Sequence, residues 1–361
     1  MELRAPHCLV ASLILGMSLW TQASTCAAAA GERTWAVLAG RGPGTGVVDG
    51  PGPTAQFNGP GNIALDGAGN LYVLDQYDTV VRRVAPNGTV TTFAQLPDVK
   101  FDINADQRAG IAVDKNGTVY VSEPSRDRLV KIAPNGFVTP YAGSQPGRRD
   151  GPALSALFAI PAGLALDTAG NLYVADSGNS TIRKITPQGI VTTIAGGPRP
   201  GLVDGPTAKA RFDTPASLAI DKQGNIYVTE FLDVDNEGRP DRASTLRKIG
   251  VDGKATTLIE DYFSDARENY VTTKPTMTYG WHIDDDTSIA LDSQGLLYIF
   301  ADGGLKRVDP SKHYEPNSPT GLDIQDVPDI VRGKSVGIAI SERGDVYVSD
   351  SDIATIFKAA P

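Results

Sequence analysis

The feature that most constrains this chain is a unit of roughly 50 residues that repeats along it. In the clearest copy, Gly147–Gly197, short apolar runs at 163–166, 172–175, 181–185 and 190–195 alternate with turns. The runs are rich in Val, Ile, Leu, Tyr and Thr and are too short for helices. The segments between them contain Asp and Gly residues, which favour tight turns. Each unit therefore predicts four antiparallel strands in series.

The first strand of the unit carries a signature that occurs six times, with Ala always in the middle. A small side chain fits where the innermost strands of neighbouring sheets crowd around a central axis. The second strand repeats a Tyr, which we expect to pack between adjacent sheets. Together these repeats predict an all-β, six-bladed β-propeller with four-stranded blades. Its inner strands are expected near residues 62–66, 110–114, 163–167, 217–221, 288–292 and 337–341.

The two ends of the chain complement each other. The sixth copy stops after its third strand, and the segment Thr34–Gly40 is similar to the fourth strand of the clearest copy, Ile190–Gly196. We therefore expect the N-terminal strand to complete the last blade, close the ring and leave no open strand edge there.

Several motifs resemble the NHL repeat family of β-propellers. They are G-N-L-Y-V-A-D at Gly170–Asp176, I-R-K-I at Ile182–Ile185, T-T-I-A-G at Thr192–Gly196, and a linker, G-x-x-D-G-P, that leads to a Phe. The linker occurs at 46–57, 147–158 and 201–212. The resemblance implies a propeller distantly similar to gluconolactonase-like propellers. It leaves the function open, because the family includes lyases, lactonase relatives, RNA binders and ligand sensors.

Residues 1–30 differ from the rest of the chain and have the features of a secretory signal peptide. Arg4 precedes an apolar run, Leu9–Trp20, and the segment ends in Ala27–Ala30. We expect residues 31–361 to form an exported, periplasmic or secreted propeller that is monomeric and has no transmembrane segment. Lipid modification at Cys26 is disfavoured, because the residues before it match a lipoprotein signal poorly.

The net charge of −9 weighs against nucleic acid as a partner, because such proteins need a basic face. A basic pair does recur on the third strand, as Arg82-Arg83, Arg183-Lys184, Arg247-Lys248 and Lys306-Arg307. Because it is distributed around the ring, we interpret it as solvated and paired blade residues.

Strand alternation places the second-to-third strand connections and the interblade linkers on one face, which we call the top face. The residues just ahead of the inner strands should surround the mouth of the channel there: Asn62, Arg108, Ser217, Ser288 and Ser335. Gluconolactonase-like propellers hold a divalent cation at this level, but only Asn62 matches such a ligand set. The two remaining histidines, His282 and His313, belong to opposite faces, so the zinc site of the family's lyases is not expected. No catalytic residue can be named.

Acids recur at the end of the second strand, as Asp75, Glu123, Asp176, Glu230 and Asp350. They could form a ring of carboxylates at the top face. The favoured interpretation is that they cap loop amides, because repeats place identical residues wherever the scaffold needs them.

The repeat is interrupted in one sector. The signature positions Asp221 and Asp292 lie 71 residues apart, farther than any other successive pair, and the surplus falls at 231–243 and 260–286. Insertions on one face of a repeat array often carry binding. The first insertion contains alternating acids followed by Gly238, which partly resemble a calcium loop: Asp233, Asp235, Glu237 and Asp241. A solvated acidic turn is the alternative.

The second insertion combines aromatic and acidic side chains: Tyr262, Tyr270, Tyr279, Trp281, His282, Asp284, Asp285 and Asp286. These residues could form a ligand wall or partner surface, or fold down to cover blades 4 and 5. Our main hypothesis is a module that binds a small molecule, glycan or protein through the top face at residues 231–286. The alternatives are a calcium-dependent, lactonase-like hydrolase or lyase, and a purely structural module of the cell envelope.

Overall fold

A computed structural model describes residues 33–40, 42, 46–96, 109–233, 242–260, 288–301, 304–311, 325–327 and 337–361. Arg33–Pro361 form one compact unit. The expected signal peptide, residues 1–30, lies outside the described residues. Within the described part of the chain, no helix is long and apolar enough to cross a membrane.

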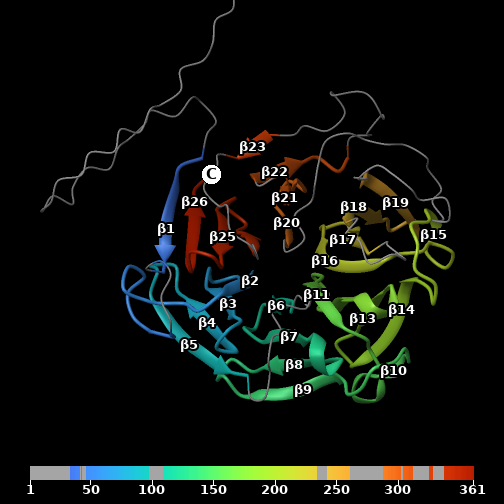
Figure 1. Ribbon diagram of the computed structural model, residues 1–361, viewed down its shortest axis with the longest axis horizontal. Helices are drawn as coiled ribbons and strands as arrows, with labels where there is room; N and C mark the ends of the chain where they lie inside the picture. Colours follow the sequence, from blue (N-terminus) through green and yellow to red (C-terminus); the bar gives the residue numbers. More distant parts are fainter. Residues whose placement is uncertain are drawn as a thin grey trace, which may run out of the picture. The chain divides into compact units, whose positions relative to one another are not determined.

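The unit consists of six antiparallel sheets, which are the blades of a β-propeller (Figure 1). Blade 1 contains β2 (Pro60–Leu65), β3 (Leu71–Asp75), β4 (Val80–Val84) and β5 (Val90–Gln95). Blade 2 contains β6 (Ile111–Val113), β7 (Val119–Glu123), β8 (Arg128–Ile132) and β9 (Val138–Gly143). Blade 3 contains β11 (Pro161–Leu166), β12 (Leu172–Asp176), β13 (Thr181–Ile185), β14 (Ile190–Gly196) and the short outer strand β10 (Gly151–Pro152).

Blade 4 contains β16 (Thr214–Ile220), β17 (Ile226–Asp233), β18 (Arg242–Ile249), β19 (Lys254–Glu260) and the outer strand β15 (Gly205–Pro206). Blade 5 contains β20 (Ile289–Leu291), β21 (Leu297–Ala301), β22 (Gly304–Val308) and β23 (Gln325–Val327). Blade 6 contains β24 (Ile338–Ile340), β25 (Val346–Asp350), β26 (Thr355–Ala359) and, as its outer strand, β1 (Trp35–Ala39). Short 3₁₀ turns occur at η1 (Pro124–Arg126), η2 (Ala153–Ser155) and η3 (Ser177–Asn179).

The inner strands contact one another in a complete cycle, β2, β6, β11, β16, β20, β24 and back to β2. Blade 6 combines the first and last strands of the unit Arg33–Pro361, because β1 pairs with β26 in antiparallel register from Trp35↔Ala359 to Ala39↔Ile356. The fourth strand of the last blade therefore comes from the N-terminal part of the unit.

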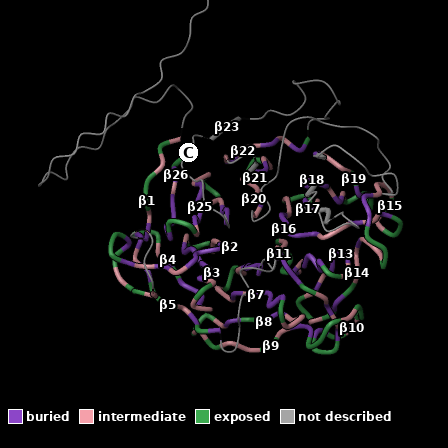
Figure 2. The backbone as a smooth tube through the Cα atoms, viewed as in Figure 1, coloured by how far each residue is buried: buried purple, intermediate pink, exposed green. Residues whose placement is uncertain are grey.

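The core lies between the blades, because each hydrophobic cluster combines residues from two neighbouring sheets. The second-strand tyrosines belong to these layers as expected; Tyr298, for example, is fully buried between blades 5 and 6. The signature alanines are buried or half-buried beside the axis. In Figure 2, exposed residues concentrate in the turns and linkers of the periphery, while most strand segments are buried or intermediate.

The turn between the first and second strands has the same chemistry in most blades. In blade 3, Asp167 Oδ1 accepts hydrogen bonds from the backbone N–H groups of Ala169 and Asn171. Gly170 has a φ of 82°, in the left-handed region that side chains disfavour. This Asx-type turn fixes the register of each inner hairpin and defines the bottom face of the propeller.

Candidate functional site

One hairpin extends farther from the top face than the others that can be compared. Strands β17 and β18 contain 8 residues each, whereas β12 and β13 of blade 3 contain 5 each. The blade 3 hairpin ends at Asp176↔Thr181, and the matching pair in blade 4 is Glu230↔Thr245. Blade 4 continues through three more pairs, Phe231↔Ser244, Leu232↔Ala243 and Asp233↔Arg242. This adds roughly 10 Å of ladder at about 3.4 Å per residue.

The sequence located this insertion but not its structure. The surplus residues 231–243 were expected to form a connection between strands, yet both strands continue into it. The sequence did not reveal that the two strands continue, because Phe231, Leu232 and Asp233 do not follow the pattern of the other copies. Backbone pairing, rather than side-chain pattern, extends the ladder here.

Most of the proposed calcium and ligand residues lie outside the described residues. This holds for Asp235, Glu237 and Asp241, and for the whole aromatic and acidic set from Tyr262 to Asp286. Asp233 is the last residue of β17, and only its backbone is described. Among the side chains that are described, no group of three or more His, Cys, Asp and Glu could hold a metal ion.

The described residues of the channel mouth connect neighbouring blades. Asn62 Nδ2 donates to Ala109 O at 2.8 Å, which joins blade 1 to blade 2. Ser217 Oγ accepts from the backbone N–H of Ile289 at 3.1 Å. Ser288 Oγ accepts from the backbone N–H of Ile338 at 2.6 Å. The other two expected mouth residues, Arg108 and Ser335, lie outside the described residues.

The remaining three blade junctions are bridged by serines that the sequence analysis did not single out. Ser122 Oγ donates to Ala162 O at 2.7 Å, Ser349 Oγ donates to Gly61 O at 2.6 Å, and Ser177 Oγ donates to Pro215 O. Where Ser122 and Ser349 bridge, a Gly directly precedes the inner strand, because a Cβ at Gly110 or Gly337 would lie 2.5 to 2.7 Å from a carbonyl oxygen of the next blade. Each of the six junctions between blades is thus spanned by a side chain from one of the two blades. For Ser122 and Ser349 the signal was the combination of Gly in the signature with Ser just before the acid, whereas Ser177 follows the acid Asp176.

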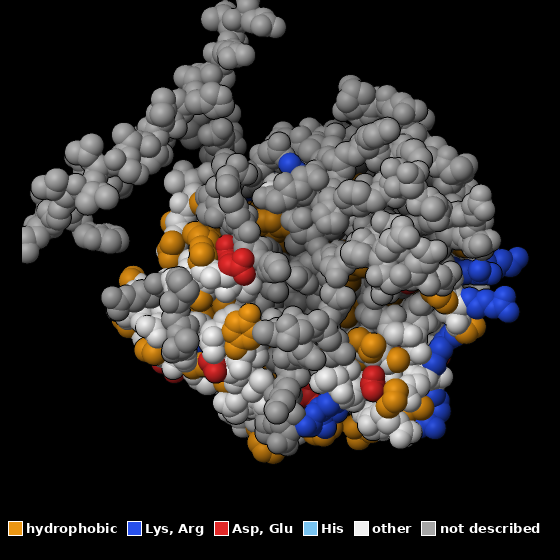
Figure 3. Space-filling view, in the orientation of Figure 1, with side chains coloured by type: hydrophobic (Ala, Val, Ile, Leu, Met, Phe, Trp, Pro, Cys, Tyr) orange, Lys and Arg blue, Asp and Glu red, His pale blue; other side chains and the backbone are white. Residues whose placement is uncertain are grey.

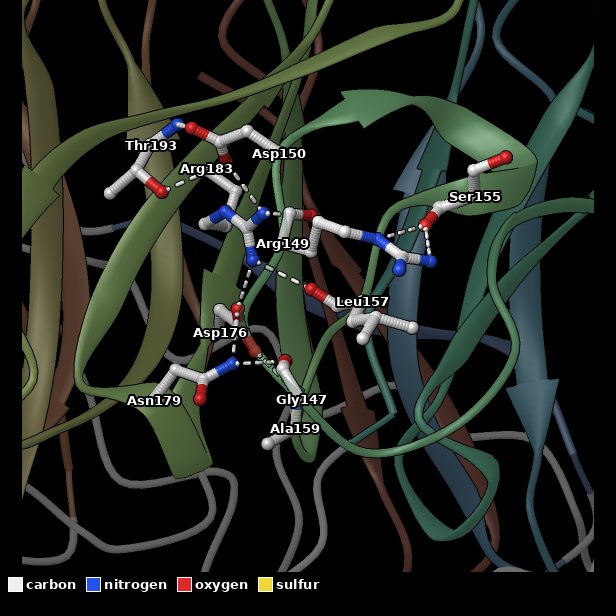
Figure 4. A network of polar contacts seen from close by, with 10 residues as sticks. All are labelled: Gly147, Arg149, Asp150, Ser155, Leu157, Ala159, Asp176, Asn179, Arg183 and Thr193. Carbon is white, nitrogen blue, oxygen red and sulfur yellow. Dashed lines mark hydrogen bonds and ion pairs between the residues drawn. The ribbon is translucent and has the colours of Figure 1, made fainter.

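The acids at the ends of the second strands belong to a buried network (Figure 4). In blade 3, Asp176 Oδ1 accepts from the backbone N–H of Ala159 at 2.8 Å, and Asp176 Oδ2 accepts from Arg183 Nη1 at 2.6 Å. The same arrangement occurs in blade 1 with Asp75 and Arg82, and in blade 4 with Glu230 and Arg247. The expectation that these acids cap loop amides is therefore confirmed for these three blades and also for blade 6, where Asp350 Oδ1 accepts from the backbone N–H groups of Asp352 and Ile353.

The expectation that the third-strand basic pairs are solvated is wrong for the first member of three of them. Arg82, Arg183 and Arg247 have no exposed side-chain surface. Each guanidinium also faces a fully buried linker Phe, with 4.3 to 5.2 Å from the guanidinium carbon to the ring centroid. The G-x-x-D-G-P linker covers these arginines, which a strand pattern alone does not reveal.

The Asp of each linker completes the cluster, which we call the arginine clamp. In blade 3, Arg183 Nη2 lies 2.7 Å from Asp150 Oδ1, and Asp150 also accepts from the backbone N–H and hydroxyl of Thr193. Asp49 and Asp204 make the corresponding contacts in blades 1 and 4. The clamp therefore ties the linker, the second strand, the third strand and the fourth strand together.

Burial affects the pKa values of the second-strand carboxyls more strongly than those of the linker carboxyls Asp49 and Asp150. It raises the pKa of Asp75 to about 6 and that of Glu230 to about 7, and it also raises the pKa of Asp176, against the opposing effect of the arginines. Burial acts in the same direction at Asp49 and Asp150, but hydrogen bonds from the fourth-strand threonine and the arginine outweigh it and lower their pKa values. One guanidinium faces two carboxylates, so the buried carboxyl is the one that takes up a proton.

Other Lys and Arg side chains are exposed, unlike the buried arginines of the clamps. On the face shown in Figure 3 they gather at the outer edge of blades 3 and 4, over the region of β10, β14 and β15. Exposed residues of these linkers include Arg148, Arg149, Arg199 and Lys209. This is a local basic rim on a chain of net charge −9.

Comparison with known proteins shows similarity at the level of family and fold. Residues 45–200 match the model of the teneurin NHL domain. The protein SUPPRESSOR OF QUENCHING 1, chloroplastic, of Arabidopsis thaliana is 32% identical over 113 residues, which are 29% of this chain and 11% of the plant protein. The chain thus matches about a tenth of the length of that relative.

Solved structures with the same fold include enzymes. A gluconolactonase from Xanthomonas campestris superposes with a TM-score of 0.53 and 14% identity, covering 91% of this chain and 90% of that one. A streptogramin B lyase gives a TM-score of 0.51 and 15% identity, covering 85% and 94%. At such identities the likeness establishes the fold alone.

Proposed function

We propose that this chain, a β-propeller whose residues 45–200 match the model of the teneurin NHL domain, is a binding module whose top face captures a small molecule, a glycan or a protein at blade 4. The observation that carries the proposal is the β17–β18 hairpin, which extends three residue pairs beyond the level at which blade 3 turns. Nothing in the blade scaffold requires this extension, since the arginine clamp is already complete at Glu230 and Arg247.

The polar groups of the scaffold support a site above the ring rather than within its mouth. Asn62, Ser217 and Ser288 use their side-chain atoms to bridge blades. The second-strand acids Asp75, Asp176 and Glu230 are buried beside arginines. A ligand at the top face would therefore be recognised by groups added to the repeat, which are concentrated in residues 231–286.

A graft tests this proposal. Residues 231–244 are replaced by Ser-Gly-Asn-Ser, the turn at 177–180 of blade 3, so that Glu230 joins Thr245 as Asp176 joins Thr181. Wild type and graft are screened against a glycan array and a small-metabolite library by thermal shift. We expect ligands of the wild type to bind the graft at least tenfold more weakly while the melting temperature of the free protein changes little. Undiminished binding by the graft would exclude blade 4 as the site.

Calcium binding and enzymatic activity are tested by separate measurements. We propose calcium binding at Asp233, Asp235, Glu237 and Asp241 as an accessory of the same hairpin, to be measured by metal analysis after dialysis against chelator. Hydrolysis of a lactone panel, with and without added calcium, tests the lactonase-like alternative. Turnover that disappears in the graft would favour the enzyme over the binding module.

Export is part of the same proposal. We infer that residues 1–30 direct the chain across a membrane and are removed between Ala28 and Gly31. N-terminal sequencing of the protein from periplasm and medium checks this directly. An uncleaved N-terminus would contradict it.

A further inference from the structure

A second candidate site lies on the bottom face, where the inner strands of three successive blades end. An open pocket of about 210 Å³ lies there between the turns of blades 4, 5 and 6. It has room for about seven water molecules at roughly 30 Å³ each, so it suits a small metabolite. Its apolar floor is formed by the last residues of the three inner strands, Ile220, Leu291 and Ile340.

The repeat changes at the acidic side of this cavity. In blades 1, 3 and 4 the turn Asp has one oxygen bonded by the amide of an Asn four residues later, as in Asp221–Asn225 at 2.7 Å. In blade 5 that Asn is replaced by Leu296, and Asp292 uses Oδ1 to accept two backbone N–H groups. No described residue bonds Asp292 Oδ2. Glu342 of blade 6 also lines the cavity, is exposed and has no partner among the described residues.

A cation lies at the same cavity. Lys222 follows the turn Asp of blade 4, and its Nζ donates to Ser293 O of blade 5 at 3.4 Å. An ammonium group has three N–H donors, so two are left for another acceptor. Lys222 is exposed, and its side chain reaches across the boundary between the two blades, which places its charge at the mouth of the pocket.

Taken together, the geometry points to a site for a small zwitterion with an apolar side chain, which is the chemistry of a free aliphatic amino acid. We propose that its ammonium group binds Asp292 and Glu342, its carboxylate binds Lys222, and its side chain packs on Ile220, Leu291 and Ile340. Charge-assisted hydrogen bonds at both ends would orient the ligand, and the floor would contribute apolar burial. This site is on the opposite face from the blade 4 hairpin, so it stands independently of the top-face proposal.

Calorimetric titration of the chain beginning at Gly31 with L-leucine tests the proposal. We expect saturable binding with one site per chain. Isopentylamine, which lacks the carboxylate, and 4-methylpentanoate, which lacks the ammonium group, should each bind at least tenfold more weakly. Absence of leucine binding, or equal binding of either analogue, would overturn the proposal.

Substitutions test whether the ligand binds in this cavity. Lys222→Met and Asp292→Asn should each weaken leucine binding at least tenfold, and Asn retains the oxygen that accepts the turn amides. The matched control is Lys115→Met, because Lys115 follows the turn Asp of blade 2 and does not line the cavity. Equal affinity of the Lys222 and Lys115 variants would exclude the cavity as the binding site. The blade 4 graft should bind leucine like the wild type, which separates the two sites.

Discussion

Blades 3 and 4 share one construction up to the level of their clamps and differ above it. Blade 3 joins Arg183 to Asp176 and Asp150, and blade 4 joins Arg247 to Glu230 and Asp204. Directly beyond the pair Asp176↔Thr181 blade 3 turns, whereas beyond the matching pair Glu230↔Thr245 blade 4 continues as a projecting hairpin. The comparison shows that the buried polar groups serve the scaffold. This difference is why we propose the part of blade 4 that blade 3 lacks as the binding site.

The largest effect is expected where a whole strand can be removed without breaking the chain. Among the six described blades, blade 6 takes its fourth strand from the N-terminal part of the unit Arg33–Pro361, since β1 pairs with β26. Deletion of residues 31–40 should expose the edge of the last blade and remove the buried Ala39 from its core. We expect a large loss of stability in chemical denaturation. A truncated protein that melts like the full one would show that β1 does not close the ring.

Removal of a clamp arginine should have the next largest effect. Arg183→Met and Arg247→Met each leave a fully buried carboxyl without its cationic partner, which typically costs about 3 to 5 kcal/mol. Because the two clamps share their geometry, the two losses should be similar when measured by urea denaturation. Arg148→Met, at an exposed position of the same linker as Asp150, is the control and should change stability little. A much smaller loss in blade 4 would show that its clamp is not equivalent.

The pH dependence of stability should be a smaller effect and should distinguish the buried carboxyls. Burial raises the pKa of Glu230 from 4.5 to about 7, so the native state binds this proton more tightly than the unfolded state. The proton's contribution is present at pH values below about 4.5 and is lost as the pH rises to about 7. Stability of the wild type relative to Glu230→Gln should therefore fall over this interval.

The corresponding change in blade 3, Asp176→Asn, should shift the pH profile in the same direction, because burial also raises the pKa of Asp176. Asp150, whose pKa is lowered, contributes in the opposite sense and only at more acidic pH. Denaturation curves at a series of pH values from 4 to 8 provide the measurement. Parallel profiles of the wild type and both variants would contradict buried carboxyls with raised pKa values.

Much of the fold could be predicted because a propeller repeats one local pattern. The signature alanines and the tyrosines recur in every copy and the Asp-Gly turns in most copies, because each reflects a constraint within one blade or between two neighbours. The candidate site was harder to predict from the sequence. Asn62, Ser217 and Ser288 have the composition of a polar channel mouth, and only their partners in the next blade identify them as bridges.

The sequence by itself determined the number of blades, the order of their strands and the sector in which the repeat is interrupted. These follow from periodicity and turn chemistry, which act over a few residues. The tertiary structure alone decided that Arg82, Arg183 and Arg247 are buried beneath their linkers, that β17 and β18 extend into the insertion, and that Lys222 and Asp292 share a cavity. Such contacts join residues of separate strands and blades, and their energies depend on burial and distance, which no local pattern records.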